Sequence, residues 1–132
     1  IKGDHCKNLF LKNKKNNFYM ISCEENTKID LKRTSKSLGL GNLSFAKEGY
    51  LDSLLGIKPG SVSPFALLND IKNDVDFYLD EKLYKSEFIN FHPLINTATI
   101  TIGVQSFINF MIENNKKIHI FSTADGLIIK KI

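Results

Sequence analysis

The apolar residues of this 132-residue chain fall in short blocks, separated by turns rich in Lys, Asn and Gly. Even the longer blocks, such as residues 107–112, are far shorter than the roughly 20 residues that a membrane-spanning helix needs. Blocks of this length suit strands and short helices, and a chain with 42% hydrophobic residues can enclose one core. We therefore expect a single domain over residues 1–132, with no membrane span and no signal peptide.

Strands are expected where apolar residues alternate with polar ones or where β-branched and aromatic residues cluster. Residues 8–12 and 18–22 predict a β-hairpin around a turn at 13–17. In chain order, further strands are expected at residues 43–45, 65–68, 75–79, 88–91, 98–102, 118–121 and 127–129.

Helices are expected at three places only. Asp30 precedes a helical period that Gly39 ends, which is a cap-to-cap signal, and residues 47–55 form a second helical pattern stopped by Gly56. Residues 106–113 carry apolar side chains at helical spacing. Because the helices are not regularly interposed between strands, the pattern favours an α+β fold over a doubly wound parallel sheet.

The charge balance is mildly basic. The sequence contains 18 Lys and Arg residues and 14 Asp and Glu residues, which gives a formal net charge of +4, and all but one of the basic residues are lysines. This excess is compatible with a polyanionic partner but does not require one, because most such charge belongs to an ordinary solvated surface. Cys6 and Cys23 are too isolated for a zinc site. We expect two free thiols in a reducing compartment, which predicts a cytoplasmic protein without a metal or other cofactor.

Standard catalytic signatures are absent from the sequence: it has no phosphate-binding Gly-rich loop, no dinucleotide fingerprint and no metal-binding His-Glu-x-x-His helix. The residue types of a Ser-His-Asp catalytic triad are present, with Ser61 or Ser63 as the serine, together with His92 and Asp70. No nucleophile-elbow sequence supports that combination, so we do not adopt it.

The acidic residues Asp74, Asp76 and Asp80 lie close together in the sequence and could suggest a cation site. They lack the spacing of a calcium-binding loop. We interpret them as a solvated strand edge.

The segment from Lys58 to Pro64 is the most distinctive loop. Two prolines restrict it, while Gly60 allows its backbone to approach a ligand closely. Such a loop can present N–H groups to a carbonyl or a developing oxyanion. Composition alone favours the alternative, an ordinary rigid turn.

Two further residues are candidates for ligand contact. Lys7 precedes an apolar strand and could bind a phosphate at the end of that strand. The alternative is an ordinary surface lysine. His92 precedes a proline, which restricts its backbone to extended geometry and gives its ring a defined direction. A core histidine with one satisfied nitrogen is the alternative.

The order of these features resembles a known family. The matching blocks are Lys7-Asn8-Leu9-Phe10-Leu11-Lys12, Ile29-Asp30-Leu31-Lys32, Leu43-Ser44-Phe45-Ala46, Pro59-Gly60-Ser61-Val62-Ser63-Pro64-Phe65, Asn69-Asp70, Asn90-Phe91-His92-Pro93-Leu94 and Asn96-Thr97-Ala98-Thr99. Together they resemble the prolyl-tRNA synthetase-associated (YbaK-type) domain, and most of all its ProX branch. The resemblance spans about Gly3 to Phe110 and implies a mixed sheet curled into a barrel-like core with helices around it.

The resemblance also implies an activity, which is hydrolysis of mischarged tRNA for proline, above all alanyl-tRNA. A cysteinyl-tRNA deacylase is the alternative enzyme, and a non-catalytic domain that binds tRNA or a synthetase is the alternative class. The implied partner is the acceptor end of tRNA, with the domain either free or attached to prolyl-tRNA synthetase. Family members carry a longer segment ahead of the Lys7 block, so we expect this chain to lack an upstream piece or to be cut from a longer protein.

The implied roles fall on matching positions. Lys7 would hold the terminal phosphate or ribose, and Asn8 would hydrogen-bond near the same end. His92 would line the amino-acid pocket, and Gly60 would bring the loop backbone to the aminoacyl group. The remaining implied substrate contacts are Ser61, Val62, Ser63, Pro64, Asn69, Asp70, Thr97 and Thr99. Asp70 is also the candidate general base, if the reaction uses one.

Overall fold

A mixed β-sheet forms the frame of the molecule in the computed structural model, which describes residues 4–58, 62–91, 100–123 and 128–132. The strands are β1 (Asp4–Lys12), β2 (Phe18–Glu24), β3 (Ser44–Phe45), β4 (Val75–Asp80), β5 (Phe88–Phe91), β6 (Ile100–Gly103), β7 (Ile118–Phe121) and β8 (Ile128–Lys131). Their order in the sheet is β6-β5-β1-β2-β4-β7-β8, and β3 also pairs with β1. Parallel and antiparallel pairs both occur, which confirms the mixed sheet that the family resemblance implied.

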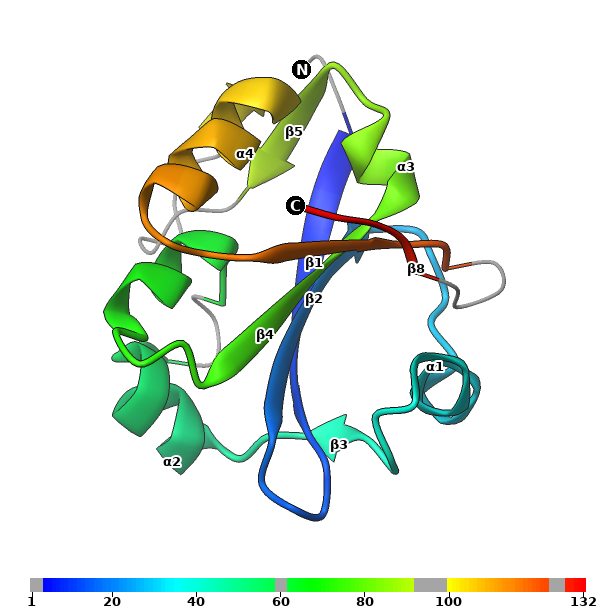
Figure 1. The fold of residues 1–132 in the computed structure, drawn as a ribbon, viewed down its shortest axis with the longest axis vertical. Coiled ribbons are helices and arrows are strands. Elements are labelled where there is room, and N and C mark those ends of the chain that lie inside the picture. Colours follow the sequence, from blue (N-terminus) through cyan, green and yellow to red (C-terminus); the bar gives the residue numbers. More distant parts are fainter. Residues whose placement is uncertain (1–3, 59–61, 92–99, 124–127) are drawn as a thin grey trace.

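The helical segments lie on both sides of the central strands (Figure 1). They are α1 (Leu31–Leu38), α2 (Glu48–Tyr50), the π-helical turn η1 (Leu51–Leu55), the 3₁₀ helix η3 (Pro64–Asn69), α3 (Glu81–Tyr84) and α4 (Val104–Glu113). Figure 1 shows α2, η3 and α4 on one side of β1, β2 and β4, with α1 on the other. The sheet curls between them, which confirms the expected barrel-like α+β architecture.

Strand alternation divides the core into two clusters. Phe10 faces Met20 across β1 and β2 in the larger cluster, which also contains buried residues of η1, η3 and α4. Leu11 faces Tyr19 on the other side of the same strands, in a smaller cluster against which the side chains of α1 pack. Because β1 and β2 are covered on both faces over this stretch, they form the middle of the molecule.

The predicted helix ends are confirmed. The Asp30 side chain accepts a hydrogen bond from the Arg33 amide at 3.1 Å and caps α1, which ends at Gly39 in the left-handed conformation. Gly56 has the same conformation (φ 65°) after η1. The predicted hairpin, the strands at 43–45, 75–79, 88–91 and 118–121, and the helix at 106–113 are also present, within a few residues of their expected ends.

The strand expected at residues 65–68 was wrong, because η3 occupies that segment. Ser63 accepts a hydrogen bond from the Phe65 amide at 3.2 Å and Pro64 takes the first helical position. These two signals favour a helical turn, and they outweigh the apolar block that suggested a strand. The strands expected at 98–102 and 127–129 correspond to β6 and β8, although their first residues lie outside the described part of the chain.

The solvated edge expected at Asp74, Asp76 and Asp80 was also wrong for Asp80. Strand β4 lies inside the sheet between β2 and β7, and Asp80 is fully buried. Its carboxylate accepts hydrogen bonds from the amides of Glu24 and Lys82 and so caps α3, a helix that the sequence analysis missed. A short polar-rich helix four residues long offers too little periodicity to be found from its pattern.

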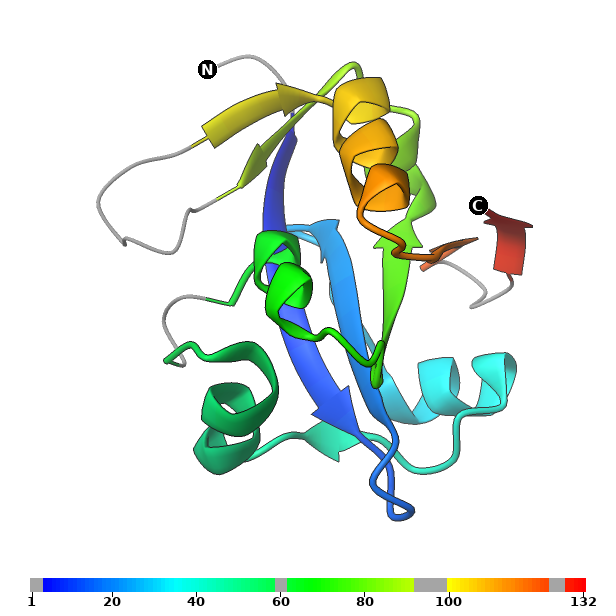
Figure 2. The same ribbon diagram turned by 60° about the vertical axis from the view of Figure 1, so that its left-hand side comes forward.

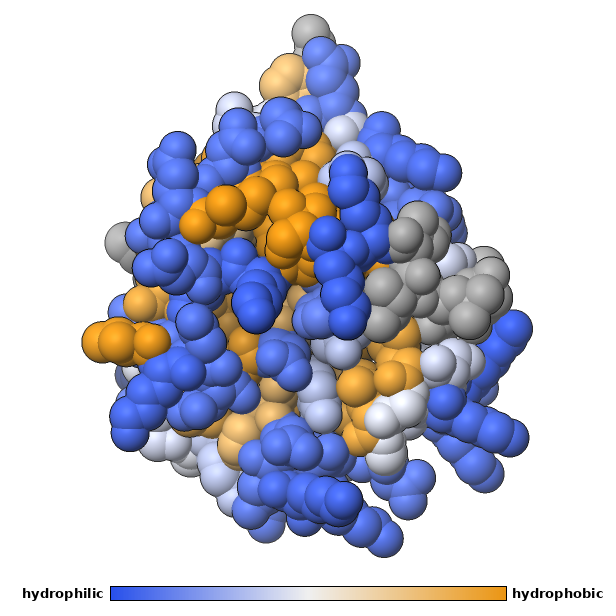
Figure 3. Space-filling model, viewed as in Figure 1, coloured by the Kyte–Doolittle hydropathy of each residue, from blue (hydrophilic) through white to orange (hydrophobic). Residues whose placement is uncertain are grey.

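On the face drawn in Figure 3, hydrophilic side chains predominate, with a broad apolar area near the C-terminal end of the chain and smaller apolar areas elsewhere. None of the helices in the described residues is both long and apolar enough to cross a membrane.

Candidate active site at a break in the sheet

The strand β1 has an unpaired stretch on one edge. On that edge its Asp4 and His5 pair with β5, while Leu11 and Lys12 pair with β3. Between these contacts, over residues 6–10, no described strand pairs with it. Figure 2 shows β5 and β3 meeting β1 near its two ends, with the middle of β1 between them. This break in the ladder contains the Lys7-Asn8 block.

The directions of the backbone hydrogen bonds along β1 show which residue of the break directs its N–H and C=O to the open edge. The Phe10 carbonyl accepts a hydrogen bond from the Ala46 amide at 3.0 Å, on the β3 side. The His5 carbonyl accepts one from the Glu25 amide at 2.9 Å, on the β2 side. Since alternate residues of a strand direct their backbone groups to opposite edges, the N–H and C=O of Asn8 point into the break.

The Asn8 side chain connects β1 to the distinctive loop. Its Nδ2 donates to the Val62 carbonyl at 3.1 Å. Its Oδ1 accepts hydrogen bonds from the Ser22 hydroxyl at 2.5 Å and from the Cys6 thiol at 3.2 Å. Val62 is followed directly by Ser63, which is fully buried and caps η3. The structure therefore brings Asn8, Val62, Ser63 and the buried Pro64 together, as one corner of the candidate site.

Lys7 lies on the opposite face of β1 from Asn8, because successive side chains of a strand alternate. Its Nζ donates a hydrogen bond to the Thr27 carbonyl, and in the strand register it faces Cys23. Lys7 and the Asn8 amide are thus not in contact. Both flank the same break, one on each face of the strand.

Asn69 and Asp70 lie away from this corner. Asn69 donates to the Leu55 carbonyl at 2.8 Å, whereas both Asp70 carboxylate oxygens accept from backbone amides, those of Asp74 and Val75. Asp70 lies just before Val75, which begins β4 and pairs with Phe18 of β2. Asn8 pairs with Ser22 of β2, and Ser22 pairs with Leu79 near the other end of β4, so Asp70 and Asn8 lie toward opposite ends of these strands. The Asn69 and Asp70 side chains serve here to hold the segment that leads into β4.

Several candidate residues lie outside the described part of the chain. These are Gly60, Ser61, His92, Thr97 and Thr99. The two described segments that lead to them, Val62 and the end of β5 at Phe91, are both in contact with the larger core cluster.

The sequence analysis missed one hydrogen-bond partner of Asn8 and one of Lys7. Ser22 lies inside an apolar strand, and Thr27 contributes only its carbonyl oxygen to Lys7. The apolar neighbours of Ser22 gave the only available signal, since a hydroxyl in a buried strand needs a hydrogen-bond partner.

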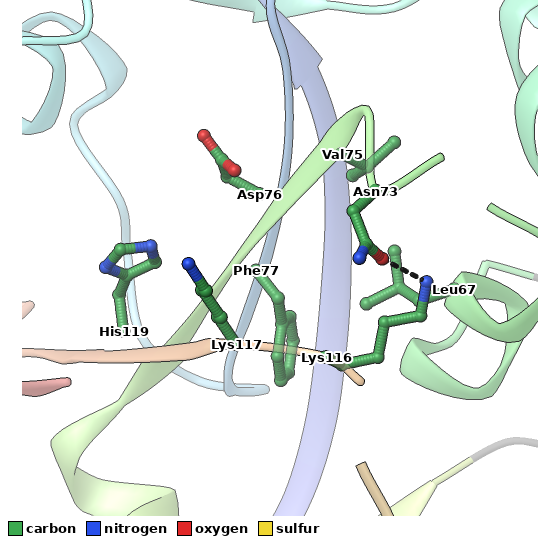
Figure 4. A pocket seen from close by; sticks show the side chains of 8 residues that line it. All are labelled: Leu67, Asn73, Val75, Asp76, Phe77, Lys116, Lys117 and His119. Carbon is green, nitrogen blue, oxygen red and sulfur yellow. Dashed lines mark hydrogen bonds between the residues drawn. The ribbon is translucent and has the colours of Figure 1, made fainter. Parts of the chain in front are cut away.

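A separate cavity of about 200 Å³ lies where β7 begins beside β4, away from the break in β1. Figure 4 shows Phe77 between two polar walls, one formed by Asn73 and Lys116 and the other by Asp76, Lys117 and His119. Lys116 donates to the Asn73 side chain at 2.6 Å and to the Asp70 carbonyl at 2.7 Å, so this amine has a structural role. Burial lowers the pKa of His119, whose ring stacks on Tyr78.

Cys6 and Cys23 are both free thiols and both buried. Cys6 shares the face of Asn8, while Cys23 pairs with Lys7 on the other face. Burial raises the pKa of both thiols, that of Cys23 to about 12. Among the described residues no three metal-binding side chains lie close enough together to hold an ion.

Comparisons with known proteins agree with this fold. The family model for the aminoacyl-tRNA editing domain matches residues 2–110. The chain belongs to this family of aminoacyl-tRNA editing domains.

Two relatives illustrate the match. The chain is 37% identical over 114 residues to the prolyl-tRNA synthetase associated domain-containing protein 1 of Xenopus laevis, covering 83% of this chain and 67% of that protein. It is 36% identical over 100 residues to the prolyl-tRNA editing protein ProX of Acetoanaerobium sticklandii, covering 75% of this chain and 61% of that protein.

Solved structures share the fold at low identity. The crystal structure of the hypothetical protein APE2540 superposes with a TM-score of 0.65 at 14% identity, over 80% of this chain and 67% of that one. A candidate trans-editing enzyme for prolyl tRNA synthetase superposes with a TM-score of 0.59 at 17% identity, over 86% and 67% of the two chains.

Proposed function

We propose that this domain hydrolyses the ester bond of mischarged tRNA for proline and prefers alanyl-tRNA. The observation that carries the proposal is the break in the sheet, where Asn8 binds the Val62 carbonyl on one face of β1 and Lys7 lies on the other. A ligand placed against this open edge can contact both faces of the strand, together with the backbone of Asn8.

The chemistry needs no resident nucleophile. An aminoacyl ester is already activated, so a positioned water and donors for the oxyanion can supply most of the acceleration. In this proposal the loop before Val62 presents backbone groups to the aminoacyl moiety, and a ribose hydroxyl of the substrate assists the attack. Asp70 has no part in the reaction, because both its carboxylate oxygens are bonded to backbone amides.

Lys7 supplies the positive charge in this scheme. Its present partner is a neutral carbonyl, that of Thr27. A phosphate oxygen is negatively charged, so its hydrogen bond with the ammonium adds an ion-pair attraction that the neutral Thr27 carbonyl does not provide. The terminal phosphate of the tRNA would therefore replace the Thr27 carbonyl as the partner of Lys7.

Selection against proline follows from pocket size. A pocket that fits one methyl group, with His92 in its wall, excludes the proline ring by overlap. Overlap rejects more strongly than the roughly 1–3 kcal/mol that a missing methylene costs. The domain would act in the cytoplasm, either free or attached to the synthetase that makes the error.

The test offers alanyl-, cysteinyl- and prolyl-tRNA for proline in parallel, with release of the amino acid as the measurement. We expect the alanyl ester to be cleaved fastest and the prolyl ester to be almost inert. Faster cleavage of the cysteinyl ester would reverse the substrate preference and keep the activity. Binding of tRNA without cleavage of any ester would leave only a tRNA-binding domain.

A further inference from the structure

Ser22 is a fully buried hydroxyl directly behind the break in β1. It lies opposite Asn8 in the register of β1 and β2, and none of its surface is exposed. A hydroxyl in such a place is costly unless it is hydrogen-bonded, and its bond here is the donation to Asn8 Oδ1 at 2.5 Å.

The carbonyl of Val62 determines the orientation of the Asn8 side-chain amide. The Val62 carbonyl can only accept, so Asn8 must direct its Nδ2 toward Val62. Asn8 Oδ1 then faces the interior, where the Ser22 hydroxyl and the Cys6 thiol are the donors. Reversal of the amide would place the Asn8 oxygen against the Val62 carbonyl oxygen and its NH₂ against Ser22.

We infer that Ser22 is a positioning residue of the editing site, which acts through Asn8 to fix the Val62 carbonyl. The inference rests on the proposed function. Val62 is the residue directly before the Ser63 cap of η3, so the hydrogen bond to its carbonyl ties the start of that helix to Asn8 in β1. Ser22 itself lies behind β1 and has no contact with the substrate.

The test is a double-mutant cycle on alanyl-tRNA hydrolysis with Ser22→Ala, Asn8→Ala and the double variant. We expect Ser22→Ala to lower kcat by roughly ten- to a hundred-fold with KM little changed, since small displacements of positioned groups have effects of this size. In the Asn8→Ala background the same substitution should have almost no further effect. An equal loss in both backgrounds, or no loss in either, would overturn the inference.

The matched control is Ser35→Ala. Ser35 is also a buried serine, bonded to the Leu31 carbonyl at 2.5 Å, but it lies in α1 on the other side of the sheet. Ser35→Ala should lower the melting temperature while leaving kcat unchanged. A loss of kcat in this control would mean that general destabilisation accounts for the effect of Ser22→Ala.

A second measurement does not depend on activity. In NMR spectra the side-chain NH₂ of Asn8 should exchange slowly with solvent in the wild-type chain and in Ser35→Ala, and faster in Ser22→Ala. If the wild-type chain cleaves no ester, the proposed function fails, and this exchange still decides whether Ser22 orients the amide. Unchanged exchange in Ser22→Ala would overturn the orienting role.

Discussion

Lys7 and Asn8 are neighbours in β1, and their side chains leave the strand on opposite faces, toward Thr27 and Val62 respectively. This arrangement places a cation and an amide on two sides of a single strand edge. Because that edge has no described strand partner between its contacts with β5 and β3, both side chains border the same opening. A substrate there would be held from two sides.

Removal of the Lys7 charge should therefore abolish most of the activity. We expect Lys7→Ala to lower kcat/KM for alanyl-tRNA by on the order of a hundred-fold, because a charge-assisted contact with the substrate is lost. Thermal unfolding should change little. Lys85→Ala is the control, since Lys85 is exposed and pairs with Glu81 at 3.4 Å. Activity of Lys7→Ala equal to that of Lys85→Ala would remove Lys7 from the site.

The buried carboxylate of Asp80 should contribute to stability. Asp80→Ala leaves the amides of Glu24 and Lys82 without their acceptor, and we expect a loss of about 2 kcal/mol in the free energy of unfolding. Asp80→Asn keeps one acceptor oxygen and should lose less. Urea denaturation measures both, with the exposed Asp52→Ala as control. Equal stability of Asp80→Ala and Asp52→Ala would contradict this role.

The two cysteines should react slowly with thiol reagents. Burial raises the pKa of Cys23 to about 12 and that of Cys6 as well, so almost no thiolate is present at pH 8. We expect alkylation of the folded chain to be slow at both positions, and fast once guanidinium unfolds it. They should also form no disulfide with each other, because their side chains lie on opposite faces of the β1–β2 pair. Rapid alkylation of the native chain would show that the thiols are accessible.

His119 should make the fold less stable in mild acid. Burial lowers the pKa of its ring; nearby Asp76 opposes this change, whereas Lys131 and Lys117 add to it, and the ring stacks on Tyr78. The unfolded chain therefore takes up the proton first. The stability present above about pH 6.5 should be lost as the pH falls through the lower folded pKa.

Urea denaturation at pH 7.5 and pH 5 tests this for wild type, His119→Gln and the control His5→Gln. The wild-type chain and His5→Gln should lose more stability between the two pH values than His119→Gln does. The same loss in all three would show that His119 has no part in the pH dependence.

Local signals in the sequence predicted most of the framework. The caps at Asp30, Gly39 and Gly56 and the alternation in the first hairpin depend on neighbouring residues only, and these were confirmed. The segment after Ser63 was mistaken for a strand because its apolar block was weighted above the Ser-Pro start of a helix. Asp80 was misplaced because its partners come from β2 and α3, which no local pattern brings together.

The sequence predicted which segments contribute to the candidate site, but not how their side chains are arranged in space. The Lys7-Asn8 block and the loop from Lys58 to Pro64 were both expected, and the structure joins Asn8 to Val62 of that loop. That Lys7 and Asn8 diverge follows from strand alternation once β1 is known to extend through them. The participation of Ser22 depends on the register between two strands, which the sequence alone does not define.

The break in β1 also bears on how such a domain can diversify. The sheet is held by ladders on either side of residues 6–10, and among the described residues two pairs, Asp4 with Ile89 and His5 with Asn90, join β1 to β5. Segments that border this opening can change in length or side-chain size without loss of any ladder hydrogen bond, as loops do on a rigid scaffold. One framework can in this way be fitted during evolution, or by an engineer, to amino acids of different volume, while the strands that carry Lys7 and Asn8 keep their places.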